Sequence, residues 1–288
     1  KNGALLVLAS ATPSTETFYE AQAGRCQLVR LTRRYAGQPL PSVQIVDMRA
    51  ELAAGNPREI SLALEDALKE NLAAGKQAIL LLNRRGYQTM AQCEDCRQVL
   101  KCPKCSVPMV YHKAGGGRLL CHYCGTQLSP RPETCPACGG RLQYWGFGTQ
   151  KAEEELAALF PEARVLRMDQ DTTAAKDAHE KLLAQFARHE YDIMVGTQMV
   201  AKGLDFEDVT LVGVLGIDSL LFAQGFRASE TVFSLVTQVV GRSGRASSPG
   251  RAIIQTTDPA NQVLAPAAAQ DYDAFFAQEI EYPRLGLS

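Results

Sequence analysis

Eight of the nine cysteines stand in four Cys-x-x-Cys pairs within one short stretch of the chain. The pairs are Cys93/Cys96, Cys102/Cys105, Cys121/Cys124 and Cys135/Cys138. Two thiolates at this spacing can bind one tetrahedral ion from a tight turn, and two such pairs supply the four sulfur ligands of a structural zinc site. A disulfide framework would use the same residues, but nothing else in the sequence indicates a secreted protein. The pairs therefore predict two zinc ions.

The four pairs can combine into two sites in three ways. Fifteen residues separate Cys105 from Cys121, which suits a zinc ribbon, and the segments 109–112 and 118–120 flank three glycines as in a hairpin. This pairing leaves Cys93/Cys96 with Cys135/Cys138, whereas pairing in sequence order would close the first site over only five residues. His112 and His122 are alternative ligands, but eight sulfurs are available, so we expect both on the surface.

A second group of residues is suited to bind an anion. Residues 238–245 read Gln-Val-Val-Gly-Arg-Ser-Gly-Arg at the expected end of a helix. Arg242 and Arg245 could aim two guanidinium groups at one polyanion, and the adjacent glycines leave room for a phosphate. A pair of solvated arginines is the alternative. The segments 196–198, Gly-Thr-Gln, and 202–205, Lys-Gly-Leu-Asp, follow an expected strand upstream.

The apolar pattern predicts the scaffold that positions these residues. Apolar runs indicate strands at 43–46, 78–82, 142–145, 165–168, 192–195, 209–215 and 252–255. Helices are expected at 60–74, 150–159, 178–188, 230–240 and 262–281. We therefore predict an α/β fold: a parallel sheet with helices on both faces, interrupted by a small two-zinc ribbon module. The residues that do chemistry in such a sheet lie at the carboxyl ends of the strands.

The first forty residues carry a similar pattern. Apolar runs at 5–8 and 26–31 predict two further strands, the first fully buried, with a helix at 15–23 between them. A small buried side chain is expected at the lone Cys26. The chain begins at Lys1 with no initiator methionine, so we expect it to be a piece of a longer protein.

Charge and hydropathy narrow the function classes. The net charge of −1 over 288 residues says nothing about partners, but residues 84–144 hold nine Lys/Arg against three Asp/Glu. This basic stretch favours a nucleic-acid surface or the solubility of a small module, and Tyr111, Tyr123 and Tyr144 could stack bases or support a hydrophobic cluster. We expect a cytoplasmic protein without membrane partners, because no apolar run is long enough to span a membrane and no signal-peptide pattern occurs.

Several of these segments resemble motifs of superfamily 2 helicases. The pattern Gln238-x-x-Gly241-Arg242-x-Gly244-Arg245 resembles motif VI, and the segments 196–198 and 202–205 together resemble motif V. Ser10-Ala11-Thr12 resembles motif III. The segments 83–87, 146–150 and 153–156, placed around the cysteine pairs, are similar to the replication-restart helicases of this superfamily in particular.

The resemblance implies an ATP-dependent 3′-to-5′ DNA helicase that recognises stalled forks and D-loops and starts primosome assembly. It implies two RecA-like lobes with ATP between them. Residues 1–40 would be the end of lobe one with a linker, 41–91 and 145–288 lobe two, and 92–144 the zinc insertion. The sequence has no G-x-x-x-x-G-K-[ST] phosphate loop and no Asp-Glu-x-His segment for Mg²⁺. ATP and Mg²⁺ would therefore bind only with the missing first lobe, and this chain alone should be inactive.

The resemblance also implies a role for each motif residue. Three residues would act on ATP, with the two arginines as arginine fingers: Arg242, Arg245 and Gln238. Three would contribute to nucleotide binding: Asp205, Gly203 and Gly241. Of these, Asp205 would place its carboxylate at the ribose. Four would contact DNA: Thr197, Lys202, Arg84 and Arg85. Two would couple hydrolysis to lobe movement: Ser10 and Thr12. The implied partners are forked DNA, D-loops, single-strand-binding protein and other primosome proteins.

An alternative hypothesis assigns the chain to a different functional class, a binding module instead of an enzyme. The chain could be a zinc-ribbon module that docks a primosome protein without direct contact to DNA. Binding of DNA through phosphates weakens steeply with salt, whereas docking on an apolar surface does not.

Overall fold

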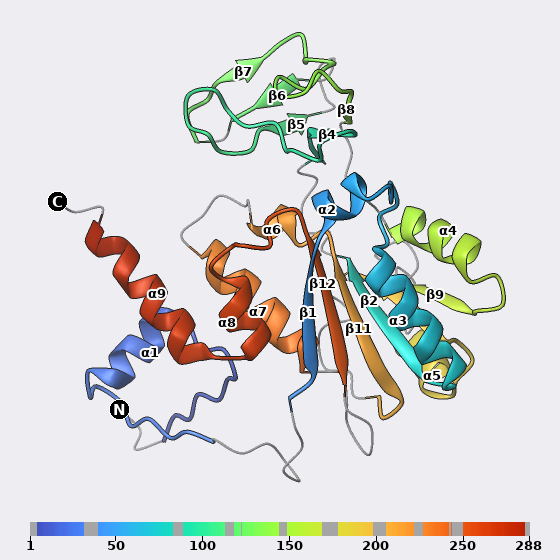
Figure 1. Ribbon diagram of the computed structural model, residues 1–288. Coiled ribbons are helices and arrows are strands. Elements are labelled where there is room, and N and C mark those ends of the chain that lie inside the picture. The colour runs from blue at the N-terminus through green and yellow to red at the C-terminus, as the bar shows by residue number, and fades with distance from the viewer. Residues whose placement is uncertain are drawn as a thin grey trace.

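Segments rich in apolar residues form the strands of a six-stranded parallel sheet in the computed structural model (Figure 1). In spatial order the strands are β1 (Ser42–Asp47), β12 (Arg251–Thr256), β11 (Val209–Leu215), β2 (Gln77–Leu82), β10 (Ile193–Gly196) and β9 (Val165–Met168). The structure describes residues 5–31, 40–82, 89–112, 118–121, 123–143, 149–168, 178–197, 206–221, 227–241, 243 and 250–285. The predicted parallel sheet is confirmed.

Helices cover both faces of the sheet, because neighbouring side chains of each strand point to opposite faces. Ile79 and Leu81 of β2 face a core built with α5 (Ala178–Ala187), α7 (Ala228–Val240), α8 (Leu264–Ala269) and α9 (Tyr272–Leu285). Leu80 and Leu82 face the opposite core, which includes α3 (Leu62–Ala73) and α4 (Thr149–Leu159). All four side chains are at most 3% exposed, which explains why β2 is apolar throughout.

The carboxyl ends of the six strands meet at one edge of the sheet, because all of the strands are parallel. Two short helices begin there: α2 (Met48–Ala53) directly after β1, and α6 (Asp218–Leu221) shortly after β11. Asp218 accepts hydrogen bonds from the Thr256 hydroxyl (2.7 Å) and from Thr257 N–H (2.9 Å), which ties the ends of β11 and β12 together. Burial raises the pKa of Asp218 above its usual range. This edge is therefore firmly held.

Beyond this edge lies a small module, here called the zinc module, comprising the described residues from Thr89 to Gln143 (Figure 1). Its strands are β3 (Thr89–Met90), β4 (Gln92–Cys93), β5 (Val110–His112), β6 (Arg118–Leu120), β7 (Gln127–Leu128) and β8 (Leu142–Gln143). β5 and β6 form the predicted hairpin, and β8 pairs antiparallel with β4. The strand expected at 142–145 thus belongs to this module as far as it is described. The predicted domain boundaries stay a prediction.

The zinc module has a core of its own. Leu100, Met109, Leu119 and Leu142 pack with buried cysteines and share no residue with the two cores of the parallel sheet. Tyr111 packs partly against this core, whereas Tyr123 is 76% exposed. Tyr144 lies outside the described residues. The two parts of the chain are therefore separately packed.

The predictions for the first forty residues are only partly correct. Helix α1 (Thr15–Gln22) is confirmed, with Ser14 as its N-cap. The strands expected at 5–8 and 26–31 are wrong: neither described segment forms a strand, and the side chains of Leu5 to Leu8 are 72–89% exposed. Cys26 is exposed, not buried. An apolar run predicts a buried strand, but it does not identify the neighbouring strand with which that strand would pair.

Candidate functional site

The eight paired cysteines converge in two groups of four. In the outer site, Cys93 and Cys96 lie with Cys135 and Cys138; in the inner site, Cys102 and Cys105 lie with Cys121 and Cys124. All ligand atoms within each group are within 4.8 Å of one another. The predicted pairing is therefore confirmed. His112 is described only in its backbone and His122 lies outside the described residues, so the alternative ligands are not tested.

The sulfur spacing distinguishes a metal from disulfides. The Sγ–Sγ distances are 3.4 Å for Cys93–Cys138, 3.8 Å for Cys96–Cys135 and 3.7 Å for Cys102–Cys124. A disulfide would need about 2.05 Å. A tetrahedron with Zn–S bonds of ~2.3 Å has edges of ~3.8 Å. Two four-cysteine groups with this spacing fit two structural zinc ions.

The four Cys-x-x-Cys turns, here called knuckles, share one backbone conformation. The residue directly after the second cysteine has a positive φ in each of them: Arg97 (57°), Ser106 (56°), Gly125 (74°) and Gly139 (76°). Its N–H donates to the carbonyl of the first cysteine at 2.8–3.1 Å. This closed turn directs both sulfurs to one point, as a metal site requires.

The thiols of these sites have shifted pKa values. A hydrogen bond with the Thr126 hydroxyl (3.0 Å) is the main cause that lowers the pKa of Cys124 to about 6. Burial raises the pKa of Cys96 to about 12. Because zinc binds the thiolate form, metal binding would release protons from the buried sulfurs.

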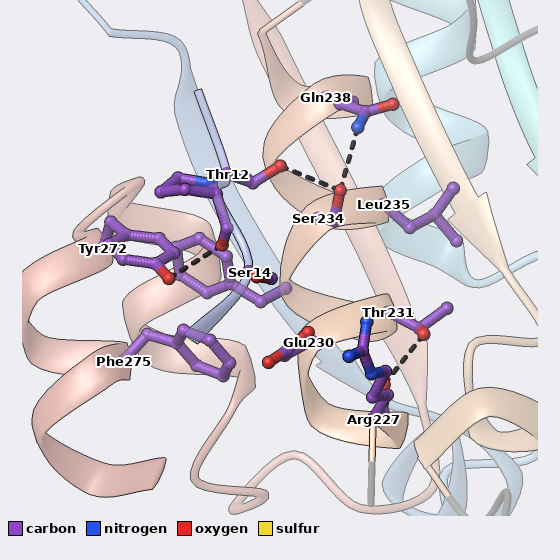
Figure 2. A pocket seen from close by; sticks show the side chains of 12 residues that line it. Thr12, Ser14, Arg227, Glu230, Thr231, Ser234, Leu235, Gln238, Tyr272 and Phe275 are labelled. Carbon is purple, nitrogen blue, oxygen red and sulfur yellow. Dashed lines mark hydrogen bonds between the residues drawn. The ribbon is translucent and has the colours of Figure 1, made fainter. Parts of the chain in front are cut away.

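A second candidate site lies where the N-terminal segment packs against α7 (Figure 2). Thr12 Oγ1 and Ser234 Oγ are 2.9 Å apart, and Gln238 Nε2 donates to the same Ser234 oxygen at 2.8 Å. Ser10 Oγ accepts from Thr12 N–H at 3.1 Å. The structure thus brings together Ser10, Thr12 and Gln238, three residues that the sequence singled out in two distant segments, with Ser234 as the bridge.

Thr12, Ser234 and Gln238 border a cavity of about 370 Å³. Glu230 accepts from Thr15 N–H at 3.1 Å and also from the Thr15 hydroxyl, and the Tyr272 hydroxyl donates to the Pro13 carbonyl at 2.7 Å. Arg227 forms an ion pair with Glu16 at 2.8 Å. Figure 2 shows the labelled side chains around this opening, with α7 on one side and α9 on the other. The described part of the N-terminal segment is therefore held by hydrogen bonds, by an ion pair and by the packing of Phe18 against Tyr272 and Phe276, and it adds no strand to the sheet.

Two further predicted site residues are described in this part of the fold. Thr197 follows β10 at the carboxyl edge, where its N–H donates to the Met168 carbonyl at 3.3 Å. Gly241 is the C-cap of α7, and its N–H donates to the Thr237 carbonyl. The other predicted residues lie outside the described part of the chain: Arg84, Arg85, Lys202, Gly203, Asp205, Arg242 and Arg245.

The sequence reading missed Ser234, Glu230 and Tyr272. Their spacing carries only a weak signal: Glu230, Ser234 and Gln238 recur every four residues and so share one face of α7. Tyr272 gave no signal, because its partner Pro13 is distant in sequence.

Comparisons with known proteins match both parts of the chain. Residues 102–128 match the PriA DNA helicase Cys-rich region domain, and residues 144–247 match the helicase conserved C-terminal domain. The replication restart protein PriA of Bacillus subtilis is 47% identical over 97% of this chain, and that of Synechocystis is 46% identical over 98%. The replication restart protein PriA of Chlamydia pneumoniae is 42% identical over 97% of it.

The chain spans only part of these relatives. It covers 34% of the Bacillus subtilis protein, 35% of the Synechocystis protein and 38% of the Chlamydia pneumoniae protein. No helix in the described part of the chain combines the length and apolar character needed to cross a membrane.

Proposed function

The chain belongs to the PriA family of replication restart proteins, and we propose that it is the second motor lobe, with its zinc insertion, of an ATP-dependent 3′-to-5′ DNA helicase. One observation carries the proposal. Two four-cysteine sites stand between β2 and α4 of a parallel sheet, and the residues that follow match a helicase C-terminal domain. A structural zinc protein alone would have no need of such a sheet.

In this proposal the nucleotide lies between this lobe and a first lobe of the longer protein. Arg242 and Arg245 reach the γ-phosphate as arginine fingers and stabilise the charge that develops during transfer. Gln238 opens the same motif, and Gly203, Asp205 and Gly241 contribute to nucleotide binding, the Asp205 carboxylate at the ribose. ATP and Mg²⁺ require the phosphate loop and carboxylates of the first lobe, so this chain alone has no ATPase activity.

The N-terminal segment is proposed to be the end of the first lobe. Its apolar side chains at 5–8 are 72–89% exposed, and Val29 and Leu31 are 72% and 94% exposed. Such runs are typical of strands that a sheet buries on both faces. Ser10 and Thr12 then couple hydrolysis to lobe movement, because Thr12 already contacts Ser234, the residue that Gln238 also contacts.

We propose forked DNA and D-loops as the substrates, with Thr197, Lys202, Arg84 and Arg85 at the backbone. The zinc module supports this with exposed cations and few exposed acids. The exposed cations are Lys101, Lys104, Arg118, Arg131 and Arg141. Single-strand-binding protein and other primosome proteins are the proposed protein partners, in the cytoplasm.

One observation also fits a second function, a zinc-ribbon module that docks a primosome protein without direct contact to DNA. Tyr123 is 76% exposed on the zinc module, as expected for a residue that docks on another protein as well as for one that stacks on a base. A salt titration of fork binding separates the two, because phosphate contacts predict a steep loss of affinity with salt. Affinity for a protein partner that is insensitive to salt, with no DNA binding at any salt, would favour the docking module.

The test of the proposed function is DNA-stimulated ATP hydrolysis. We expect the longer protein that contains this chain to hydrolyse ATP when forked DNA is added and to separate the strands in the 3′-to-5′ direction. The 288-residue chain should do neither. A longer protein without DNA-stimulated hydrolysis, or a purified chain that hydrolyses ATP by itself, would refute the proposal.

A further inference from the structure

Two of the four knuckles carry a residue that does not suit its backbone, Arg97 and Ser106. The position after the second cysteine has a positive φ in every knuckle, and two knuckles place glycine there. Glycine adopts this conformation without steric cost, whereas a residue with a Cβ is strained in it. In the first knuckle the residue is Arg97, with φ 57°. A strained residue at a fixed position suggests that its side chain has a separate role.

The Arg97 side chain leaves the zinc module and contacts the sheet domain. Its Nη1 donates to Glu59 Oε1 at 2.9 Å, and its Nη2 donates to the Pro57 carbonyl at 2.6 Å. The side chain is only 13% exposed and that of Glu59 is 23% exposed. The pair is therefore shielded from solvent, where charge-assisted hydrogen bonds are strong.

The segment that Arg97 contacts is itself rigid. Glu155 of α4 accepts from the N–H groups of Glu59 (3.3 Å) and Ile60 (2.9 Å). Gln255 at the end of β12 accepts from Ser61 N–H at 2.9 Å and donates to the Glu59 carbonyl at 2.6 Å. The segment 57–61 is thus fixed to both a helix and a central strand. It can therefore hold the zinc module in place through Arg97.

The two zinc sites differ in this respect. The inner site has Ser106 and Gly125 at the same positions, and neither makes a side-chain contact with the sheet domain among the described residues. In the described part of the chain, Arg97 connects the outer site to the segment at the carboxyl edge of the sheet. A zinc ion held by Cys93, Cys96, Cys135 and Cys138 would fix the turn from which Arg97 extends.

We propose that Arg97 is a positioning residue that fixes the orientation of the zinc module on the motor lobe, with the outer zinc site as its support. The functional consequence of this contact rests on the proposed function: a zinc module that binds DNA must move together with the lobe that binds DNA. The contact itself does not depend on that function.

The test compares two glycine substitutions at equivalent positions. Arg97→Gly relieves the backbone and removes the contact, and Ser106→Gly relieves the backbone of the inner site only. The measurement is ¹⁵N relaxation and residual dipolar couplings of the chain loaded with two zinc ions. In the original chain and in Ser106→Gly, the amides of the zinc module and of the sheet should report one common alignment and one rotational correlation time.

In Arg97→Gly the module should keep both zinc ions and reorient separately, with transverse relaxation rates of its amides lower by roughly twofold or more. Arg97→Lys should give an intermediate result, because one ammonium group replaces the fork only partly. A module that still tumbles with the sheet in Arg97→Gly would overturn the proposal. Loss of zinc in that variant would also overturn it, since the role of Arg97 would then lie within the knuckle. Neither ATP nor DNA enters the measurement, so its failure is distinct from failure of the helicase proposal.

Discussion

Removal of zinc should unfold the zinc module and leave the parallel sheet intact. The core that packs with the cysteines of the module buries four large apolar side chains: Leu100, Met109, Leu119 and Leu142. Full burial of each contributes about 1.5–3 kcal/mol, and therefore about 6–12 kcal/mol together. One structural zinc ion contributes about 10–16 kcal/mol, so two ions outweigh this core. The module cannot be expected to stay folded without them.

The sheet should lose little, because its two cores share no residue with that of the module. The contact between Arg97 and Glu59 is the exception, and loss of ~1 kcal/mol there would lower the melting temperature of the sheet by about 2–4 °C. The assay is titration with a chelator, followed by colorimetric zinc release and by amide hydrogen exchange.

We expect two zinc ions per chain, with loss of protection in β5 and β6 and full protection in β2 and β10. Cys26→Ser should release the same two ions, because Cys26 lies outside both sites. Loss of protection in both sheets in a single transition would refute the reasoning that the cores are independent. Release of one ion per chain would refute the two-site assignment.

Three further predictions follow from the site and the sheet. In the longer protein, Arg242→Ala or Arg245→Ala should lower kcat for ATP by roughly 10³-fold while fork binding falls much less, and Arg245→Lys should restore little; steady-state kinetics and a binding titration check this. Gly213→Ala should destabilise the chain by about 1–3 kcal/mol in urea denaturation, because its Cβ would lie 2.6 Å from a Leu80 methyl group in the core. Hydrogen bonds from Lys76, and to a smaller extent from His189, lower the pKa of Asp208. The ionised carboxylate therefore stabilises the fold above pH ~4, and this stabilisation is lost as the pH falls through the lowered pKa. Melting temperatures measured against pH should fall less on acidification in Asp208→Asn than in the original chain.

The sequence predicted the elements whose signal is local. The six strands of the parallel sheet and most of its helices lie where the apolar periodicity placed them, because a strand such as β2 is buried on both faces and must be apolar throughout. The ligand pairing could also be derived, since the loop lengths between knuckles limit which pairs can meet. These features depend on short segments and their spacing.

The errors concern partners rather than patterns. The segments 5–8 and 26–31 have strand-like sequences, but pairing requires a neighbouring strand, and periodicity does not identify one. The bridge from Thr12 through Ser234 to Gln238 joins two segments more than 200 residues apart, as does the contact of Tyr272 with Pro13. The positive φ of Arg97 could not be predicted, because only glycine at that knuckle position would have indicated it in the sequence.

The order of strands in the sheet has a consequence for synthesis of the protein. β2 is completed at Leu82, but both of its neighbours, β10 and β11, begin only at Ile193 and Val209. A ribosome adds ~5–20 residues per second, so the fully apolar β2 waits about 5–20 s before a pairing partner emerges. The zinc module lies between β2 and β10 in the sequence, and its described strands pair with one another, as β4 does with β8. It can therefore fold and take up metal while the larger sheet is still exposed to chaperones.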